Sequence, residues 1–394
     1  MNRIELTEYA PRTFTRSQLS DEQGEAIYRL WGSKLDVEFP SPKTMNAWRI
    51  TPHGWVGLLP VTRDLALDIR PKVPIANILR MFEYAYGLRS VEFHKEVAGC
   101  ATLDGFYSKL AQILSTRILH RARRGLYRGY IPAAESLPAV RGRIDVRRHV
   151  SAPCTTSIPC DFEEHTTDVI ENQILAWTLT RIAHSTSLAG SARPLVRNAL
   201  RTVRNAATER TFRAADCVDR LYNRLNDDYQ QLHLLCRFFL EHTGPTVSDG
   251  EAHTVPFVVN MARLFELFVA EWLRAYFRTH APRYTIRWQD HASLGVHEHL
   301  RFSIDIVVHD RELDRNVAVV DAKYKVPDRV STDDVAQVTL YAQLRDCRNA
   351  VLVYPAMPKR VLDATTPQQH RIRTLWFALE GDLDEAGRRF ASEL

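Results

Sequence analysis

The sequence lacks the features that mark secreted, membrane-spanning or disulfide-stabilised proteins. Its six cysteines are scattered and none forms a CxxC pair, so neither a paired-cysteine zinc site nor a disulfide framework is expected. Residues 1–16 carry charges throughout and predict no signal peptide. No stretch approaches the roughly 18 uninterrupted apolar residues that span a bilayer. We therefore expect a cytoplasmic protein in a reducing environment, with no membrane partner.

The sequence also lacks a strong net charge and a nucleotide-binding loop. Its 394 residues carry a formal net charge of only +5, whereas proteins that grip nucleic acid unaided usually have a larger basic footprint. No G-x-x-x-x-G-K-[ST] motif occurs, so any nucleotide-driven motor that acts with this chain must be another protein. Both absences fit a protein that depends on a partner.

Length and composition predict a folded protein with more than one domain. The hydrophobic fraction of 45% and the charged fraction of 25% are close to the globular average. We predict a multidomain α+β protein with three regions: a β-rich N-terminal region over residues 1–75, a mainly helical middle region over 76–245, and an α/β domain with a mixed sheet over 246–394. Turn-forming residues at 243–250 mark the last boundary.

Local patterns predict individual elements in the first two regions. Ser20 is expected to cap a helix that spans residues 17–30. Residues 52–54, Pro-His-Gly, are expected to form the turn of a hairpin. Residues 65–70 alternate between apolar and polar side chains and predict a half-buried strand. In the middle region, apolar residues at helical spacing predict helices, with one short extended interruption at 140–146.

The third region alternates between helical and extended patterns. It predicts helices at 261–277 and 332–344, and strands at 300–308, 317–323, 350–354 and 371–377. This alternation is typical of an α/β domain whose strands share one mixed sheet.

Two acids stand in the apolar strands of this region. Asp305 lies inside the strand predicted at 300–308, and Asp321 follows the apolar run 317–320. Burying a carboxylate is costly unless it is paired or bound to metal. If the two strands are neighbours, both acids converge on one cation, and a hard cation such as Mg²⁺ prefers oxygen ligands and supplies an activated water.

Other polar side chains are expected beside this pair. Lys323 lies two residues beyond Asp321 on the same strand face, where it would hold water or stabilise a charged transition state. Glu266 is an acid amid large apolar residues on the preceding helix. Gln337 and Tyr341 are four residues apart and share one helix face. The alternative is that Asp321 and Lys323 form a solvated ion pair, which a bare D-x-K motif gives most often.

These residues resemble the PD-(D/E)xK nuclease motif. Ile304-Asp305 is followed by Asp321-Ala322-Lys323, and residues 337–341 resemble the QxxxY element of the RecB-like branch. Ile304 stands where the motif has proline, and the second acid is Asp instead of Glu, but neither change removes a ligand.

The nuclease resemblance implies a fold and a set of roles. Residues 246–394 would form a restriction-endonuclease-like domain. Asp305, Asp321 and the Ala322 carbonyl would bind Mg²⁺ or Mn²⁺, and Lys323 would orient water. Supporting roles are implied for Glu266, which would assist the site, and for Gln337, Tyr341 and Lys325, which would contact DNA or brace the site.

A larger part of the chain is similar to McrC, the nuclease subunit of modification-dependent McrBC restriction systems. The segments that carry the resemblance are 69–75, 141–145, 160–168 with Glu171-Asn172, 260–266 and 321–325. It implies cleavage of double-stranded DNA and a partner, a hexameric McrB-like AAA+ GTPase that binds the GTP. Residues 1–245 would dock onto this partner and stimulate it. Arg63, Arg70 and Lys72 are candidate contacts, although support of the β-region is the favoured interpretation of these residues.

Several alternatives stay open. His165 and Asp168, at helical spacing within the acidic segment 161–172, are a second candidate for metal binding, but helix capping and ion pairs explain them more simply. The chain is alternatively a non-cleaving activator or scaffold of an AAA+ motor, or a RecB-like exonuclease. The complete set of Asp305, Asp321 and Lys323 argues against the scaffold, and the long N-terminal region argues against a lone exonuclease.

Overall fold

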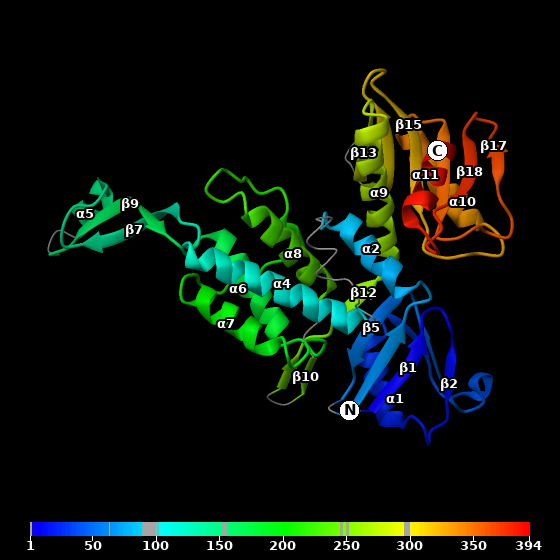
Figure 1. Cartoon of the computed structure of the whole chain (residues 1–394), viewed down its shortest axis with the longest axis horizontal. Helices are drawn as coiled ribbons and strands as arrows, with labels where there is room; N and C mark the ends of the chain where they lie inside the picture. Colours follow the sequence, from blue (N-terminus) through cyan, green and yellow to red (C-terminus); the bar gives the residue numbers. More distant parts are fainter. Residues whose placement is uncertain are drawn as a thin grey trace. The chain divides into compact units, whose positions relative to one another are not determined.

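The structure, a computed structural model, describes residues 2–62, 64–88, 100, 102–151, 156–244, 247–249, 252–294 and 300–394. The chain divides into two compact units (Figure 1). The first unit joins Met1–Phe106 to Thr246–Leu394, and the second is Tyr107–Pro245. The three ranges predicted as domains stay a prediction, and part of the boundary at 243–250 lies outside the described residues. Within the described ranges, no helix is long and apolar enough to cross a membrane.

Two sheets form the N-terminal part of the first unit. The four-stranded sheet contains, in spatial order, β1 (Asn2–Thr7), β6 (Leu65–Arg70), β5 (Trp55–Pro60) and β12 (Val258–Asn260). The three-stranded sheet contains β2 (Arg12–Phe14), β4 (Trp48–Pro52) and β3 (Leu35–Glu38). β1 runs parallel to β6, and β12 adds to the edge strand β5 from the other half of the chain. The two halves of this unit are therefore hydrogen-bonded into one sheet.

Helix α1 (Asp21–Trp31) confirms the predicted cap. The Ser20 side chain accepts a hydrogen bond from the Gln23 N–H, and the Gln23 side chain accepts one from the Ser20 N–H. This reciprocal pair satisfies two of the N–H groups that a helix start leaves free. The helix ends at buried Trp31, whose Nε1 donates to the Pro60 carbonyl at 2.9 Å and ties α1 to β5.

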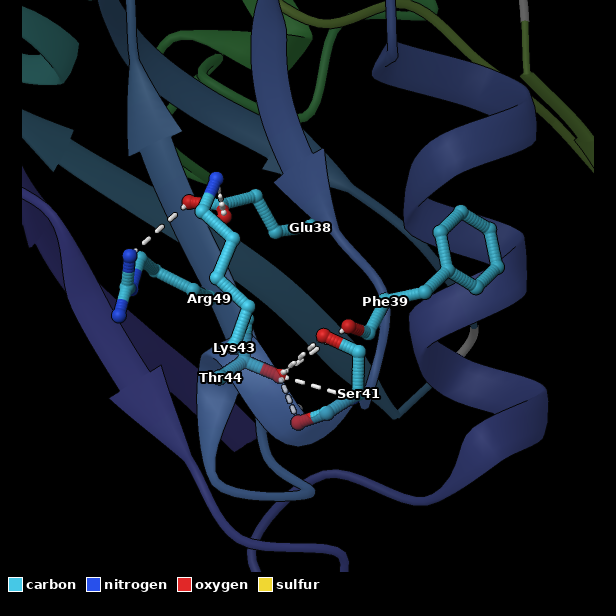
Figure 2. Close-up of polar contacts among 6 residues, drawn as sticks. All are labelled: Glu38, Phe39, Ser41, Lys43, Thr44 and Arg49. Atoms are coloured by element: carbon cyan, nitrogen blue, oxygen red, sulfur yellow. Dashed lines mark hydrogen bonds and ion pairs between the residues drawn. The ribbon is translucent and has the colours of Figure 1, made fainter.

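A short 3-10 turn (Pro42–Thr44) joins β3 to β4. Figure 2 shows that Thr44 is its centre: the Ser41 N–H donates to Thr44 Oγ1 at 2.9 Å, and that hydroxyl lies 3.2 Å from the Phe39 carbonyl. Glu38 pairs with Lys43 at 3.0 Å and with Arg49 at 3.3 Å. The hydrogen bond from Lys43 is the main reason that the pKa of Glu38 is lowered. The connection is therefore fixed by polar contacts.

The predicted hairpin around Pro52-His53-Gly54 is wrong. β4 pairs with β2 and β3, whereas β5 pairs with β6 and β12, so the two strands belong to different sheets. Gly54 has a φ of 61°, a left-handed conformation that glycine adopts without steric cost, and it turns the chain from one sheet to the other. The strand predicted at residues 65–70 is confirmed as β6.

The second unit is mainly helical, as predicted, but it also contains a long β-hairpin. Its helices are the larger part of α4 (Leu103–Arg123), α5 (Val146–Ser151), α6 (Ile170–Ala183), α7 (Arg193–Arg204) and α8 (Tyr229–His242), with a 3-10 turn at Ala214–Cys217. Strands β7 (Gly129–Leu137) and β9 (Ile158–Thr166) pair along nine positions, and β8 (Arg143–Ile144) adds to β9. Only β8 corresponds to the predicted extended interruption. β7 was missed because apolar residues stand at successive positions from 130 to 134, so its sequence shows no alternation between apolar and polar side chains.

The acidic segment 161–172 does not form the second metal site. His165 lies on β9 and not on a helix, and its ring stacks on Tyr130 with centroids 4.8 Å apart. Asp168 accepts hydrogen bonds from the N–H and hydroxyl of Thr208, both at 2.6 Å, and from Gln173. Their interpretation as a helical ligand pair is wrong, and Asp168 has a structural role.

A six-stranded mixed sheet forms the C-terminal part of the first unit. Its spatial order is β13 (Tyr284–Leu294), β14 (Leu300–Asp310), β15 (Arg315–Ala322), β16 (Asn349–Tyr354), β18 (Arg371–Trp376) and β17 (Asp363–Thr365). β13 to β15 are antiparallel, and β15, β16 and β18 are parallel. The mixed sheet and the predicted strands are confirmed, whereas β13 and β17 were not predicted.

Helices cover this sheet (Figure 1). Helix α10 (Thr332–Leu344) lies between β15 and β16 in the chain, and its Val338 and Ala342 pack with Val307 and Val319 in one apolar cluster. Helix α9 (Met261–His280) contacts β13, β15 and helix α2 (Ile75–Ala85), and α11 (Leu383–Glu393) contacts α9 and β18. Helices α2, α9 and α10 confirm the predictions, and α11 was missed. Asp321 and Asp305 thus lie on the face that α10 covers.

Candidate active site

The register of two antiparallel strands brings Asp305 and Asp321 together. Ile306 lies opposite Val320, so the next position along the pair sets Asp305 opposite Asp321. Opposite residues of an antiparallel pair project from the same face. The Ala322 N–H donates to Asp305 Oδ2 at 2.9 Å, which holds this carboxyl beside the end of β15. The structure therefore unites the two acids that the sequence singled out.

Both carboxyls are held where ionisation is unfavourable. Asp321 is only 1% exposed and Asp305 is half-buried. Burial, together with the charges of Asp321 and Glu266, raises the pKa of Asp305 to about 8. Burial also raises the pKa of Asp321, although Lys323 opposes this effect. Without a bound cation, the pair is therefore not fully ionised near neutral pH.

Lys323 completes the charge arrangement. Its Nζ lies 2.8 Å from Asp321 Oδ2 and donates to Gln337 Oε1 at 2.8 Å. Burial alone would lower the pKa of Lys323, but the charges of Asp321 and Asp305 outweigh it and raise the pKa. The side chain therefore stays an ammonium, which can hold a water or stabilise negative charge but cannot accept a proton.

Gln337 and Tyr341 lie on the same face of α10, as predicted, and form a chain behind the lysine. Gln337 Nε2 donates to the Tyr341 hydroxyl at 2.8 Å. Tyr341 is buried, and its ring contacts Phe302 on β14 with centroids 6.4 Å apart. This geometry favours the bracing role for both residues, and their contact with DNA stays a prediction.

Glu266 and Lys325 stand at the margin of the site. Arg263 Nη1 lies 3.8 Å from a Glu266 oxygen. Burial and the charge of Asp321 raise the pKa of Glu266, although the charge of Arg263 opposes this rise. Lys325 is exposed and pairs with Asp334 at 2.6 Å. Lys325 is thus held away from Asp321, and neither residue joins the central pair directly.

Two residues near the site were missed by sequence reasoning. Asp334 is buried on α10, and its charge contributes to the raised pKa of Asp321; its spacing of three residues before Gln337 was an available signal. Gln289 lies opposite Asp305 between the pairs Trp288–Ile306 and Asp290–Ile304, and its φ of 48° interrupts the ladder there. A non-glycine residue in this conformation is strained, and sequence gives no sign of it.

The donor set suits a hard cation that keeps part of its water shell. No cluster of three or more His, Cys, Asp or Glu side chains in the described ranges is arranged to hold a metal. The site instead offers two carboxylates, with the Ala322 carbonyl next to one of them. Mg²⁺ is commonly bound by one or two carboxylates with several waters. Two close acids with raised pKa values are also the groups that a bound dication would help to ionise.

Comparisons with known proteins identify a family and similar proteins. Residues 50–355 match the model of the family described as McrBC 5-methylcytosine restriction system component. The chain is 23% identical over 271 residues to the type IV methyl-directed restriction enzyme EcoKMcrBC of Escherichia coli K12, which covers 65% of this chain and 74% of the relative.

Two solved structures from Thermococcus gammatolerans are also similar. A chain of the half-complex of McrB AAA+ hexamers with bound McrC is 18% identical, covers 100% of both chains and has a TM-score of 0.55. A chain of the McrBC complex is 19% identical, covers 69% of this chain and 87% of that chain, and has a TM-score of 0.44. The first likeness extends to the whole fold. Since the family match spans most of the sequence, the chain belongs to the McrBC 5-methylcytosine restriction system component family.

Proposed function

We propose that this chain is the metal-dependent DNA endonuclease subunit of a GTP-driven, McrBC-like modification-dependent restriction complex. The observation that carries the proposal is the convergence of Asp305, Asp321 and Lys323 at the end of β15. The mixed sheet with α9 and α10 on it supports a PD-(D/E)xK fold for residues 246–394. Membership of the McrBC family supports a role in restriction.

Each residue of the site has a distinct task in this proposal. Asp305, Asp321 and the Ala322 carbonyl would hold Mg²⁺ or Mn²⁺, which when bound supplies a Lewis acid and a water of lowered pKa. Lys323, as an ammonium, holds the attacking water or stabilises charge that develops on the phosphate. Gln337 fixes the direction of Lys323, and Tyr341 fixes Gln337. The negative charge of Glu266 would favour binding of the cation.

We also propose a partner, a hexameric McrB-like AAA+ GTPase that binds the GTP. The names of the similar solved structures carry this inference, since McrC is bound there to McrB hexamers. Residues 1–245 of this chain would dock onto the GTPase and stimulate it, in the cytoplasm. Of the candidate contacts, Lys72 is exposed, Arg70 pairs with Glu5, and Arg63 lies outside the described residues.

The test is cleavage of closed circular plasmid DNA, methylated and unmethylated, by the complex of this chain with its GTPase partner, GTP and Mg²⁺. Asp321→Ala should lower cleavage by at least about 100-fold, because it removes a metal ligand and the partner of Lys323, while GTPase stimulation is retained. Asp333→Ala, an exposed acid on the same α10, is the matched control and should cut normally.

The outcomes separate the rival functions. Equal cutting by wild type and Asp321→Ala would refute the site. If neither protein cuts but both stimulate GTP hydrolysis, the non-cleaving activator becomes the better interpretation. An exonuclease of the RecB type needs a DNA end, so activity restricted to linearised plasmid would favour that alternative.

A further inference from the structure

Glu8 is a buried acid that lies far from the candidate site in the sequence. It follows β1, its side chain is 0% exposed, and the next residue, Tyr9, turns the chain with a φ of 54°. Glu8 Oε1 accepts hydrogen bonds from the Lys72 N–H at 2.7 Å and from the Tyr324 hydroxyl at 2.9 Å. Its Oε2 is buried and has no hydrogen bond within the part of the chain that the structure describes. Such an acid is costly to bury and calls for an explanation.

Tyr324 connects Glu8 to the candidate site because it directly follows Lys323. Its ring packs against Phe265, with centroids 6.0 Å apart, and against Tyr9 at 6.3 Å. Phe265 in turn precedes Glu266 on α9. The Lys323 N–H donates to the Val353 carbonyl of the neighbouring strand β16 at 2.9 Å. The tyrosine hydroxyl therefore anchors the turn that carries the lysine.

We propose that Glu8 is a positioning residue of the nuclease site: by holding the Tyr324 hydroxyl, it fixes the turn that directs Lys323 toward Asp321 and Gln337. This inference rests on the proposed nuclease function. It makes the N-terminal part of the first unit a structural support of the site.

Packing alone does not hold the turn. A cavity of about 420 Å³ borders it and is lined by Glu8, Tyr324 and Lys325, among others. This pocket is partly open to solvent, so protein atoms do not enclose the segment on that side. Besides the backbone hydrogen bond from Lys323 to Val353, the hydrogen bond from Tyr324 to Glu8 is a directional contact that fixes this segment.

Glu8 is also not needed merely to join the two halves of the first unit. Asn77 on α2 donates to the Leu379 carbonyl at 2.8 Å, and both Arg80 and Tyr84 of the same helix contact Asp384 on α11. These contacts hold the N-terminal part of the first unit to its C-terminal part. Among them, Glu8 is the residue that contacts the segment next to Lys323.

The experiment uses the complete complex with its GTPase partner and compares five variants with wild type, including one control and one double variant. Tyr324→Phe and Glu8→Ala each remove the anchoring hydrogen bond, and Glu8→Gln keeps an acceptor oxygen. Tyr84→Phe is the matched control, because it breaks another tyrosine–carboxylate contact between the same two stretches of chain away from Lys323. Melting temperature, GTPase stimulation, kcat for cleavage and KM for DNA are measured for each.

We expect Tyr324→Phe and Glu8→Ala to lower kcat by roughly 10- to 100-fold, the effect of a small displacement of a reacting group. KM and GTPase stimulation should be unchanged, Glu8→Gln should recover most of the rate, and Tyr84→Phe should cut as wild type does. The double variant Glu8→Ala with Tyr324→Phe should lose no more than either single variant, because both break one contact.

Several results would overturn the inference. One is a wild-type rate for Tyr324→Phe. Another is an equal loss of rate in Tyr84→Phe, or a parallel loss of GTPase stimulation, since either would indicate general loosening. Absence of cutting by the wild-type complex would instead refute the proposed nuclease function, and with it the positioning role; this outcome is recognised without any of the variants.

Discussion

Two buried aspartates of the same sheet have very different hydrogen-bonding and ionic partners. Asp310, at the end of β14, is 0% exposed, and Asp321, at the end of β15, is 1% exposed. Asp310 accepts hydrogen bonds from Arg283 at 3.0 Å and from the N–H groups of Glu312 and Leu313. Asp321 has Lys323 as its ionic partner and a second acid, Asp305, beside it.

The pKa directions express this difference. Burial alone would raise the pKa of Asp310, but its N–H donors and Arg283 outweigh burial and lower it. The pKa of Asp321 and that of Asp305 are raised. The donors around Asp310 are complete within the protein, so the folded state gains from its charge. The charges of Asp321 and Asp305 have no such complete set of partners, and this is why we propose a dication at this site.

The largest expected effect comes from replacing Asp305 or Asp310 by asparagine, one at a time. Asp305→Asn should lower cleavage by at least about 100-fold and leave the metal-free melting temperature equal or higher, because it removes a repelled charge and keeps an acceptor for the Ala322 N–H. Asp310→Asn should do the reverse, with a lower melting temperature and unchanged cleavage per folded molecule. Thermal scans and plasmid cleavage measure both. A lower melting temperature for Asp305→Asn would contradict the proposed difference between Asp305 and Asp310.

The second prediction concerns pH and metal. The folded pKa of Asp305 is raised from 3.8 to about 8, so the folded state binds more protons than the unfolded one between these values. Its contribution to stability is therefore full at low pH and is lost as pH rises toward 8. The lowered pKa of Asp310 acts oppositely, and its contribution is lost as pH falls below 3.8.

In the proposed function Mg²⁺ binds the folded state, which allows a sharper test. At a concentration 100 times its dissociation constant, a ligand adds about 2.7 kcal/mol to the free energy of unfolding. We expect Mg²⁺ to raise the melting temperature of wild type near pH 8, EDTA to reverse the rise, and Asp305→Asn to abolish it. An equal rise in that variant would show that the cation binds elsewhere.

The smallest expected effect comes from replacing Lys325. Its ionic partner is Asp334, so it does not belong to the central pair of Asp305 and Asp321. Lys325→Ala should change the free energy of unfolding by less than about 1 kcal/mol, as expected for a partly exposed ion pair. If Lys325 contacts a phosphate, the slope of DNA affinity against salt concentration should fall by about one. Salt titrations of DNA binding measure this, and a fall in kcat comparable to that of Asp305→Asn would contradict a peripheral role.

The sequence predicted the core of the site because the relevant signals are local. An acid inside an apolar strand, such as Asp305, is visible within a few residues, and the spacing of Gln337 and Tyr341 defines one helix face. The residues that it missed depend on long-range pairing. Glu8 and Tyr324 are 316 residues apart, and the strain at Gln289 exists only because β13 lies beside β14.

The same reason explains the errors in the fold. The strands on either side of Gly54 were identified correctly, but local pattern cannot tell that each pairs within a different sheet. Strand β7 carries apolar residues at successive positions from 130 to 134, so no alternation reveals its period. The spacing of apolar residues indicates which face of an element is buried. It does not indicate which strands pair with one another.

The addition of β12 to β5 has a consequence for how the protein is made. β1, β5 and β6 leave the ribosome early, whereas β12 and then Tyr324 arrive only after the whole second unit has been synthesised. At about 5–20 residues per second, this wait is on the order of ten seconds or more. The N-terminal sheet stays unfinished at one edge during that time. A chain that terminates before β15 therefore lacks Asp321 and Lys323 of the candidate site.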